Sequence, residues 1–373
     1  MPDFHVREVP PGTEWAYQRL HGLEVAVNLE LFGEDQTRSP ERLLTEYTHE
    51  LTALKGMLVA LAGPEPADPA RGRFGLPITT EPAEILGAAE FALPLLDNTH
   101  LMDDLFVQVD AGHRRRGIGT ALWREVRRIA AERDRDTVLG WTEHLAATPA
   151  AEWVRPATGE GELPVDAGTR FAQALELSLG QVERQSRLEL PVPPERLAAL
   201  RAEAEALAVP GYRLVSWVGP VPEDYLEKVA RMNHVLSTDA PTGDIDWRPE
   251  VWDAERVRTL SDWEHRTGTG VYTLAVADAT GEVAGLTHIH CDHAHLDRPE
   301  QWNTSVVAEH RGHRLGMLVK TANLELLART YPQARHIDTW NADENQYMLA
   351  INIALGYRLH GLTGGWQAKL NAG

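Results

Sequence analysis

Two segments of the chain, about 200 residues apart, place basic side chains directly before glycine. The first reads HRRRGIG and contains Arg114, Gly117 and Gly119, and the second reads HRGHRLG and contains Arg311 and Gly316. A helix start offers unpaired N–H groups and a partial positive charge. Glycine lets the backbone approach a bulky anion, and arginine adds charge-assisted hydrogen bonds. Each segment therefore predicts a cradle for a phosphate or pyrophosphate.

Two common phosphate-binding motifs do not fit these segments. No Lys-Ser or Lys-Thr follows the glycines, as a Walker A motif requires. The dinucleotide motif needs a third glycine where the chain has Leu122. A plain structural turn is the alternative, but two copies in the same strand–loop–helix context favour a binding loop.

The length and charge of the chain limit the classes of protein it can belong to. Its 373 residues predict two domains. The net charge of −19, with scattered Lys and Arg, argues against a nucleic-acid partner. No apolar run approaches the roughly 20 residues that cross a bilayer, and the start does not resemble a secretory signal. With a single cysteine, we expect a cytoplasmic protein without membrane contact.

The hydrophobic periodicity predicts the same order of elements in both halves. For the second half, the expected strands and helices are a strand at 212–219, helices at 222–236 and 249–268, strands at 271–278, 282–290 and 301–308, a helix at 315–330, a strand at 334–340, a helix at 345–356 and a closing hairpin at 357–370. The first half repeats this outline, with an irregular insertion at 144–167. We expect one domain over 1–192, a linker helix over 193–210 and a second domain over 211–373.

The first loop resembles the acetyl-CoA pyrophosphate loop of the GCN5-related N-acetyltransferase (GNAT) family, whose pattern is Arg/Gln-x-x-Gly-x-Gly/Ala. The second loop is similar, with Arg314 in place of the first glycine. The stretch 341–357, which spaces three asparagines and a methionine before Gly-Tyr, is similar to the family's strand-to-helix end. The resemblance covers nearly the whole chain as a tandem pair, with the layout of mycothiol synthase-like members.

The resemblance implies an α/β (α+β) fold with two GNAT-like domains, each a mixed, mostly antiparallel twisted sheet flanked by helices. The fourth and fifth strands of each sheet would splay so that pantetheine binds between them like an added strand. The implied co-substrate is acetyl-CoA, and no metal is expected. The residues implied to hold it are Val109, Asp110, Arg114, Arg115, Arg116, Gly117, Ile118, Gly119 and Thr120 in the first domain, and Val306, Val307, Arg311, Gly312, His313, Arg314, Leu315, Gly316, Met317, Asn341 and Asn345 in the second.

Acetyl transfer to an amine needs a base. Some family members carry it near the start of the strand that leads into the phosphate loop. Asp103 and Glu300 each precede the loop arginine by eleven residues, so both are candidate catalytic bases. An exposed carboxylate at a strand end is the alternative. The family's usual acid, a tyrosine four residues before the glycine of the last helix, is replaced by Asn352, so the acid is unassigned.

The loop STDAPTGDIDW contains Asp239, Asp244 and Asp246 in a region that lines the family's acceptor cleft. Clustered carboxylates there would suit a cationic substrate, and a polar loop of turns and helix caps is the alternative. The segment HIHCDHAHLD, residues 288–297, is rich in histidine. Zinc sites usually draw ligands from two separated places, so we favour a His-rich strand end over a metal site.

We therefore expect an N-acetyltransferase that moves an acetyl group from acetyl-CoA to the amine of a small molecule. We expect the second domain to be the catalyst, and the protein to be a monomer or a homodimer. Two alternatives stay open. One is a non-catalytic CoA-binding sensor or scaffold, and the other is an acyltransferase that uses a longer acyl-CoA or a carrier-protein thioester.

Overall fold

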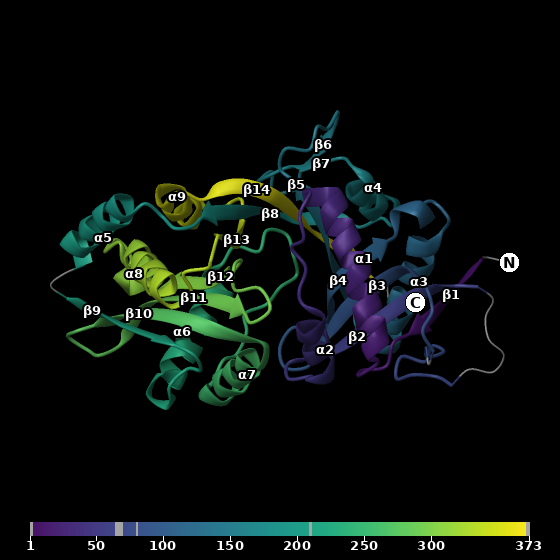
Figure 1. Ribbon diagram of the computed structural model, residues 1–373, viewed down its shortest axis with the longest axis horizontal. Coiled ribbons are helices and arrows are strands. Elements are labelled where there is room, and N and C mark those ends of the chain that lie inside the picture. Colours follow the sequence, from purple (N-terminus) through teal and green to yellow (C-terminus); the bar gives the residue numbers. More distant parts are fainter. Residues whose placement is uncertain (1–2, 64–69, 80, 209–210, 371–373) are drawn as a thin grey trace. The chain divides into compact units, whose positions relative to one another are not determined.

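The computed structural model describes residues 3–63, 70–79, 81–208 and 211–370. The chain divides into two compact units (Figure 1). The first unit contains the chain up to Val182, the short segment Gly243–Trp247 and the chain from Thr363 onward. The second unit contains Glu183–Thr242 and Arg248–Leu362.

The first unit is a mixed sheet with helices on both faces. Its strands, in spatial order, are β1 (Phe4–Glu8), β2 (Ala53–Ala62), β3 (Ile85–Pro94), β4 (Leu101–Val109) and β5 (Thr137–Leu145), followed by the end of β14 (Arg358–Lys369) and the start of β8 (Ser178–Glu189). Strands β1 to β4 are antiparallel, and β4 and β5 are parallel. Helices α1 (Glu14–Phe32) and α2 (Pro40–Thr48) pack on one face, and α3 (Ile118–Glu132) packs on the other. Helix α4 (Ala167–Ala174) follows a small hairpin, β6 (Trp153–Val154) and β7 (Leu163–Pro164).

The second unit repeats this plan. Its strands, in spatial order, are the end of β8, β13 (His336–Ala342), β12 (Glu300–Val306), β11 (Val283–Asp292), β10 (Gly268–Ala277) and β9 (Tyr212–Val218). Helices α6 (Leu226–Asp239) and α7 (Ala254–Thr267) pack on one face of the sheet. Helices α8 (Leu315–Thr330), α5 (Pro194–Ala208) and α9 (Gln346–Leu355) belong to the core on the other face.

The helix after each phosphate loop is buried to a different degree. In α3, Ile118, Leu122, Val126 and Ile129 form a single buried stripe at helical spacing, as expected of a helix with one solvent face. In α8, every residue from Leu315 to Leu324 is buried, because α5 shares a core with it on the side away from the sheet. A polar side chain in this part of α8 therefore lies in the core.

The predicted fold class is confirmed, since each unit is a mixed, mostly antiparallel sheet flanked by helices. The parallel pairing of β4 with β5 ends at Leu105 and Gly140, although β4 continues to Val109. Between β12 and β13 the parallel register consists of the pair Glu300 and Asp338. Beyond these residue pairs, the described strands show no backbone ladder between β4 and β5 or between β12 and β13. The predicted splay requires this separation.

The division into units differs in detail from the predicted boundaries. The expected linker helix forms as α5, but it packs in the core of the second unit, and residues 209–210 lie outside the described chain. The last strand of each half contributes to both units, because β8 enters the second unit at Glu183 and β14 enters the first unit at Thr363. The predicted hairpin at 357–370 is wrong: Gly364 and Gly365 stay in one extended strand, and neither has a positive φ.

Candidate functional site

The first phosphate loop is held in place by its own arginine. Arg114 donates from Nε to the Val109 carbonyl at 3.0 Å and makes two hydrogen bonds of 2.7 Å to Glu30 on α1. Gly117 then takes a left-handed turn, with φ of 83°, and starts α3. The first N–H groups of α3 have no partner within the helix, as at any helix start. The loop therefore presents backbone donors, and Arg114 supports them from behind.

The second loop makes the same turn without glycine. Arg314 starts α8 with φ of 54° and ψ of 24°, close to the left-handed conformation of Gly117. Its guanidinium pairs with Glu203 at 3.1 Å. Arg311 pairs with Asp239 at 2.5 Å. Replacement of the first glycine thus leaves the backbone turn intact, and a bound anion would compete with Asp239 and Glu203 for the two arginines.

The second glycine of each loop is required by close packing. A Cβ on Gly119 would lie 2.9 Å from Cζ of Phe171 on α4. A Cβ on Gly316 would lie 2.9 Å from Cδ1 of Ile351 on α9. The two helix starts therefore sit against equivalent helices, and larger residues there would push the loop and the helix apart.

Other predicted loop residues contribute through the backbone or brace the loop. The side chains of Ile118, Leu315 and Met317 are buried in the core, so only their backbone can face a ligand. Asp110 and Val307 use their N–H groups on the carbonyls of Leu86 and Ala284. The remaining contacts and backbone angles are Arg116 Nη2 to the Gly112 carbonyl at 3.1 Å, His113 Nδ1 to Asp110 Oδ1 at 2.7 Å, the His313 ring 5.6 Å from the Tyr212 ring, and positive φ at Arg115 and Gly312.

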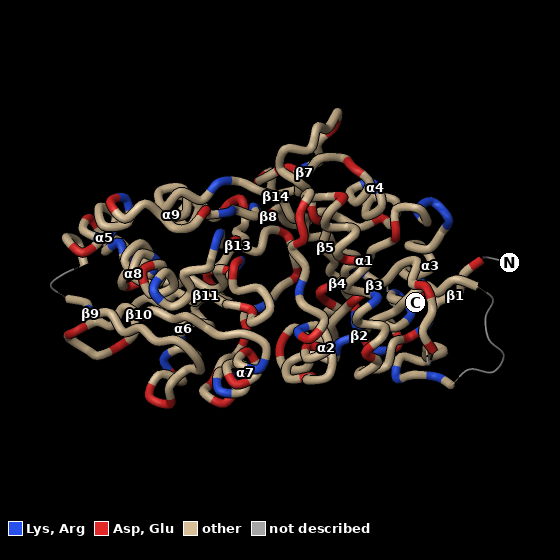
Figure 2. Tube along the Cα trace, viewed as in Figure 1, with Lys and Arg blue, Asp and Glu red and all other residues tan. Residues whose placement is uncertain are grey.

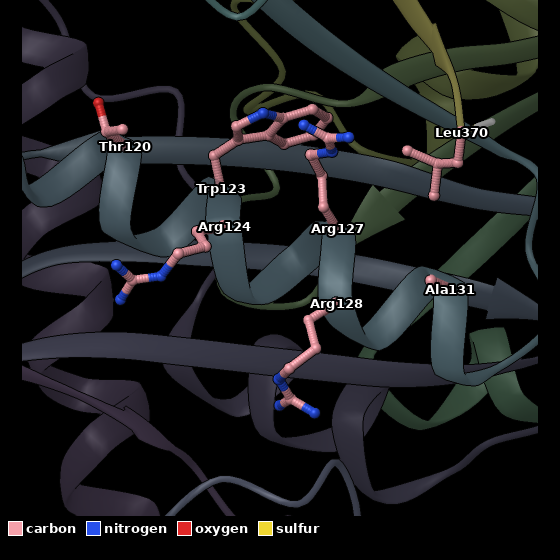
Figure 3. Close-up of a pocket in the computed structure, with 7 residues that line it drawn as sticks. All are labelled: Thr120, Trp123, Arg124, Arg127, Arg128, Ala131 and Leu370. Carbon is pink, nitrogen blue, oxygen red and sulfur yellow. The ribbon is translucent and has the colours of Figure 1, made fainter. Parts of the chain in front are cut away.

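A pocket of about 490 Å³ lies along α3, directly after the first loop (Figure 3). Thr120 and Trp123 begin it, and three arginines of the same helix line it. Arg128 pairs with Glu125 and Glu132, and the exposed Arg124 also pairs with Glu125 at 3.4 Å. Arg127 is exposed as well. The pocket therefore carries positive charge beside the phosphate loop and suits an anionic group. Its lining is Thr120, Trp123, Arg124, Arg127, Arg128, Ala131 and Leu370.

In the second unit, a buried carboxylate gathers three donors on the α6–α7 face of the sheet. Glu264 Oε1 accepts from His288 Nε2 at 2.9 Å and from His290 Nδ1 at 2.8 Å, and Oε2 accepts from the Tyr272 hydroxyl at 3.0 Å. Burial alone would raise the pKa of Glu264, but the two histidines outweigh it and hold that pKa well below its usual range. Two histidines of the histidine-rich strand thus donate hydrogen bonds to a buried carboxylate. Within the described ranges, no group of three or more His, Cys, Asp or Glu is arranged to hold a metal.

This cluster is joined to the predicted base Glu300. The ring of Trp302 stacks on His290 at 4.5 Å, and its indole N–H donates to Glu300 Oε2 at 2.9 Å. Glu300 lies opposite His290 in the β11–β12 register and is half-buried. Asp103 in the first unit is also half-buried. Both candidate bases are half-buried rather than exposed, and their catalytic role stays a prediction.

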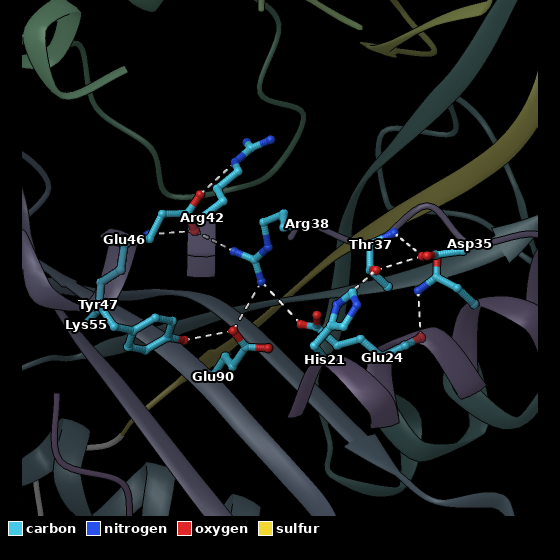
Figure 4. Close-up of polar contacts among 11 residues, drawn as sticks. His21, Glu24, Asp35, Thr37, Arg38, Arg42, Glu46, Tyr47, Lys55 and Glu90 are labelled. Atoms are coloured by element: carbon cyan, nitrogen blue, oxygen red, sulfur yellow. Dashed lines mark hydrogen bonds and ion pairs between the residues drawn. The ribbon is translucent and has the colours of Figure 1, made fainter. Parts of the chain in front are cut away.

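The first unit has a different cluster on the equivalent face (Figure 4). Glu90 Oε2 accepts from the Tyr47 hydroxyl at 2.8 Å and from Arg38 at 3.2 Å, and Arg38 also pairs with Glu46 and Glu24. Burial and the neighbouring Glu90 raise the pKa of Glu24 well above its usual value. Burial opposes ionisation of Glu46, but Arg38 and the other cations lower its pKa to about 2. Three carboxylates therefore share a few cations here.

A buried amine lies on the opposite face of the second unit. Lys320 of α8 is 1% exposed, and its Nζ donates to Asn352 Oδ1 at 2.9 Å. Asn352 in turn donates to Asn341 Oδ1 at 2.8 Å, and the ring of Tyr357 lies 5.4 Å from Nζ. Burial lowers the pKa of Lys320 to about 7. Asn345 accepts from the Met348 N–H at the start of α9.

The three predicted acceptor carboxylates do not form one cluster. Asp239 pairs with the loop residue Arg311. Asp244 and Asp246 belong to the segment that joins the first unit, where the Asp244 carbonyl accepts from Gln367 and Asp246 pairs with Lys369. The reason is backbone pairing, since the Asp244 N–H donates to the Gly180 carbonyl.

Sequence reasoning missed Glu264, Lys320 and the network around Glu90. In the sequence, Glu264 resembles any polar residue on an amphipathic helix. Only its proximity to His288 and His290 in the folded structure distinguishes it. Lys320 stands out only by its place in a run of residues that are otherwise mostly apolar. In both cases the tertiary contact, and not the local pattern, defines the site.

Basic and acidic residues are interspersed along the described trace. Lys and Arg alternate with Asp and Glu along the trace of both units (Figure 2). None of the described helices combines the length and the apolar character needed to span a bilayer.

Comparison with solved structures identifies the architecture. The chain matches a tandem GNAT protein from the clavulanic acid biosynthesis pathway with a TM-score of 0.72 and 22% identity, covering 98% of both chains. It matches a GCN5-related N-acetyltransferase from Sphaerobacter thermophilus with a TM-score of 0.60 and 14% identity, covering 99% of this chain and 96% of that one. A putative acetyltransferase from Pyrococcus horikoshii gives a TM-score of 0.51 and 12% identity, with 99% and 90% coverage. No protein-family model and no curated protein matches the sequence.

Proposed function

We propose that this chain, which has the tandem GNAT fold, transfers an acetyl group from acetyl-CoA to the amine of a small molecule, and that the second unit is the catalyst. The observation that carries this proposal is that polar groups lie on both faces of the sheet in the second unit. One face holds Glu300 beside the Glu264 cluster, and the other holds the buried amine of Lys320. The first unit has Trp123 where the second has Lys320.

The phosphate loops fit a CoA pyrophosphate. Both present a helix start after a left-handed turn, and both place a glycine where a side chain would collide with the next helix. The arginines are held by exposed or half-buried carboxylates, and such pairs contribute little to stability and exchange readily for a phosphate. Acetyl-CoA supplies an activated acyl group when bound, and the backbone donors of the loop orient it.

On the α6–α7 face, Glu300 is the residue that takes the proton from the attacking amine. The indole N–H of Trp302 holds one of its carboxylate oxygens, and stacking on His290 fixes the indole. Glu264 in turn fixes His290 through Nδ1. Glu300 is therefore oriented by a buried chain of contacts, which is how a general base is kept in reach of its substrate.

On the opposite face, Lys320 supplies the proton that the leaving thiolate needs. It lies against Asn352, which occupies the place of the family's usual tyrosine acid. No carboxylate in the described part of the chain pairs with it. Because burial lowers its pKa to about 7, its ammonium group gives up a proton readily near neutral pH.

The reaction is tested by following free-thiol release from acetyl-CoA against a panel of small amines. Glu300→Gln and Lys320→Met should each lower kcat by roughly a hundredfold, the usual worth of a positioned acid or base. Asp103→Asn makes the matched change in the first unit. Loss of activity with Asp103→Asn and not with Glu300→Gln would move the reaction to the first unit, and no amine-dependent release at all would favour a CoA-binding sensor.

The same assay also tests which acyl donor the protein uses. Acyl-CoA substrates of increasing chain length, or a carrier-protein thioester, would show a preference for a larger donor. We place the reaction in the cytoplasm, in a monomer or a homodimer without nucleic-acid or membrane partners. The net charge of −19, with basic and acidic residues interspersed along the trace, supports the absence of a nucleic-acid partner.

A further inference from the structure

The first unit contains a hydrogen-bonded chain of hydroxyl, imidazole and carboxylate that the proposed reaction does not use. Thr142 Oγ1 lies 2.8 Å from His144 Nε2, and His144 Nδ1 lies 2.7 Å from Asp166 Oδ2. Thr142 and His144 belong to β5, and Asp166 caps the start of α4. His144 is 0% exposed, whereas Thr142 is half-buried. Asp166 is also half-buried, with 25% of its side chain exposed, so the buried imidazole lies between two partly exposed residues.

The order of atoms is that of a hydroxyl nucleophile with its base and orienting acid. Asp166 accepts from the Thr169 N–H at the helix start, which fixes the carboxylate. Burial would raise the pKa of Asp166, but its bond to His144 lowers it, so the carboxylate is ionised and holds the Nδ1 proton. Nε2 is then free to accept the hydroxyl proton of Thr142.

The hydroxyl has a second, fixed partner. Trp366, which is buried, donates from Nε1 to Thr142 Oγ1 at 2.8 Å. An indole N–H is a donor only, so it stabilises negative charge that develops on this oxygen. The same contact gives the buried indole N–H its acceptor.

These three hydrogen-bonded residues lie at the end of the first unit where the acyl-CoA thioester is expected. Thr142 comes two residues after Gly140, where the pairing of β4 with β5 ends. It corresponds to Asn341 of the second unit, since each follows a tryptophan of the fifth strand, and Asn341 contacts Asn352 at the place of the family's acid. The start of α4 adjoins it, because a Cβ on Gly168 would lie 3.7 Å from Thr142 Cβ. The positive end of the α4 helix dipole therefore lies near Thr142.

We propose that Thr142, His144 and Asp166 form a second acyl-transfer site, in which the first unit takes an acyl group from an acyl-CoA thioester onto the Thr142 hydroxyl and passes it to water. This rests on the proposed binding of acyl-CoA. Thr142 Oγ1 forms a bond to the acyl carbon while His144 Nε2 takes the hydroxyl proton. The C–S bond breaks, and the thiolate leaves with that proton. A water molecule, deprotonated by His144, then attacks the ester, so that carboxylic acid is released and the Thr142 hydroxyl regains its proton.

The test uses the full-length chain without any amine. The protein is incubated with acetyl-CoA and, separately, with p-nitrophenyl acetate, and peptide mass spectrometry locates acetyl groups while thiol release is followed. We expect acetylation at Thr142 with both reagents and slow amine-independent thiol release. Thr142→Ala should abolish both signals, and His144→Ala and Asp166→Asn should lower them by roughly a hundredfold. Asp166→Asn retains a side chain that can cap α4.

Three controls keep the result interpretable. Thr142→Ser keeps the hydroxyl and should keep both signals, which separates loss of chemistry from loss of packing. Thr48→Ala removes an exposed threonine at the end of α2 and should change neither signal. Glu300→Gln should remove amine-dependent transfer and leave acetylation of Thr142 in place, so the two proposals fail separately.

Two outcomes would overturn the proposal. One is an absence of acetyl-Thr142 together with thiol release that is equal in the wild type and Thr142→Ala. The other is labelling of Thr142 by p-nitrophenyl acetate alone, which would exclude the thioester as donor.

Discussion

At the start of α3 the left-handed turn is made by Gly117, and at the start of α8 the same turn is made by Arg314. The second loop glycines, Gly119 and Gly316, meet equivalent helices at the same distance. The two units therefore keep one backbone plan around the phosphate loop. This shows that the plan depends on the turn and on the close approach of the next helix, and that the first glycine is dispensable.

Behind this common plan, the side chains at equivalent positions differ in kind. On the phosphate-loop face, the first unit has an apolar residue or a hydroxyl where the second has an amine or an amide. On the other face, an acidic residue of the first unit corresponds to a histidine of the second. These pairs are Trp123 and Lys320, Ala172 and Asn352, Thr142 and Asn341, and Glu90 and His288. A shared fold thus carries two different sets of polar groups.

The largest expected effect concerns the two polar clusters. Glu264→Ala leaves two histidines and a tyrosine without their shared acceptor, so we expect a loss of about 3–5 kcal/mol in the free energy of unfolding. Glu90→Ala should cost less, about 1–2 kcal/mol, because Arg38 keeps Glu46 and repulsion of Glu24 falls. Urea denaturation measures both. Equal losses in the free energy of unfolding would contradict the expected difference between the two clusters. In one cluster a single carboxylate accepts from three donors, and in the other three carboxylates share a few cations.

The next effect concerns the cradles. A glutamate at Gly119 or Gly316 adds both a collision and a negative charge at an anion site, so acetyl-CoA affinity for that unit should fall by roughly a hundredfold or more. Isothermal titration calorimetry of the wild type and both variants checks this. Two sites, each lost with its own variant, would support two working cradles. Loss of the only site with Gly119→Glu would contradict our assignment of the catalyst.

A graded effect, spread over several pH units, is expected in the dependence of stability on pH. Lys320 has a usual pKa of 10.5, and burial lowers it to about 7 in the folded chain. Between these values the unfolded state binds the proton that the folded state has released, so stability rises with pH by up to about 1.4 kcal/mol per unit from this group. Lys320→Met should remove that slope, measured by urea denaturation from pH 7 to 10. An unchanged slope would show that the amine stays charged.

The smallest effect tests the turn itself. Arg314 pays for a left-handed conformation that glycine adopts freely, at about 1 kcal/mol. Arg314→Gly also loses its exposed pair with Glu203, which contributes little. We therefore expect a gain of at most about 1 kcal/mol in stability, read from the thermal midpoint. Gly117→Arg in the first unit should show the opposite sign, and a loss of stability in both variants would contradict the equivalence of the two turns.

Much of the fold could be predicted from the sequence because its signals are local. The stripe Ile118, Leu122, Val126 and Ile129 identifies α3, and the strand–loop–helix context identifies both phosphate loops. The loop residues Arg114 and Arg311 lie where the pattern places them. The closing hairpin was mispredicted, since the glycine pair at 364–365 can serve a turn or an extended strand, and only the neighbouring strands choose between them.

The candidate catalytic groups divide in the same way. Asp103 and Glu300 were found from their spacing to a motif. The fate of Asp244 and Asp246 was not predictable, because the segment around them pairs with Gly180, which lies more than sixty residues away. The sequence of a short loop contains no local pattern that predicts which strand it will pair with.

The sequence by itself determined the duplicated order of strands and helices, because periodicity is a property of short segments. It also carries the predictions of two cradles and of no nucleic-acid partner, which rest on glycine placement and on charge. Only the tertiary structure decided which side chains act together. Glu264 contacts His288 and His290, burial beside Asn352 lowers the pKa of Lys320, and Asp166 contacts His144 from the other end of an insertion. The physical reason is that burial and hydrogen bonding, which set the pKa and the orientation of a group, depend on neighbours that the chain brings together only when it folds.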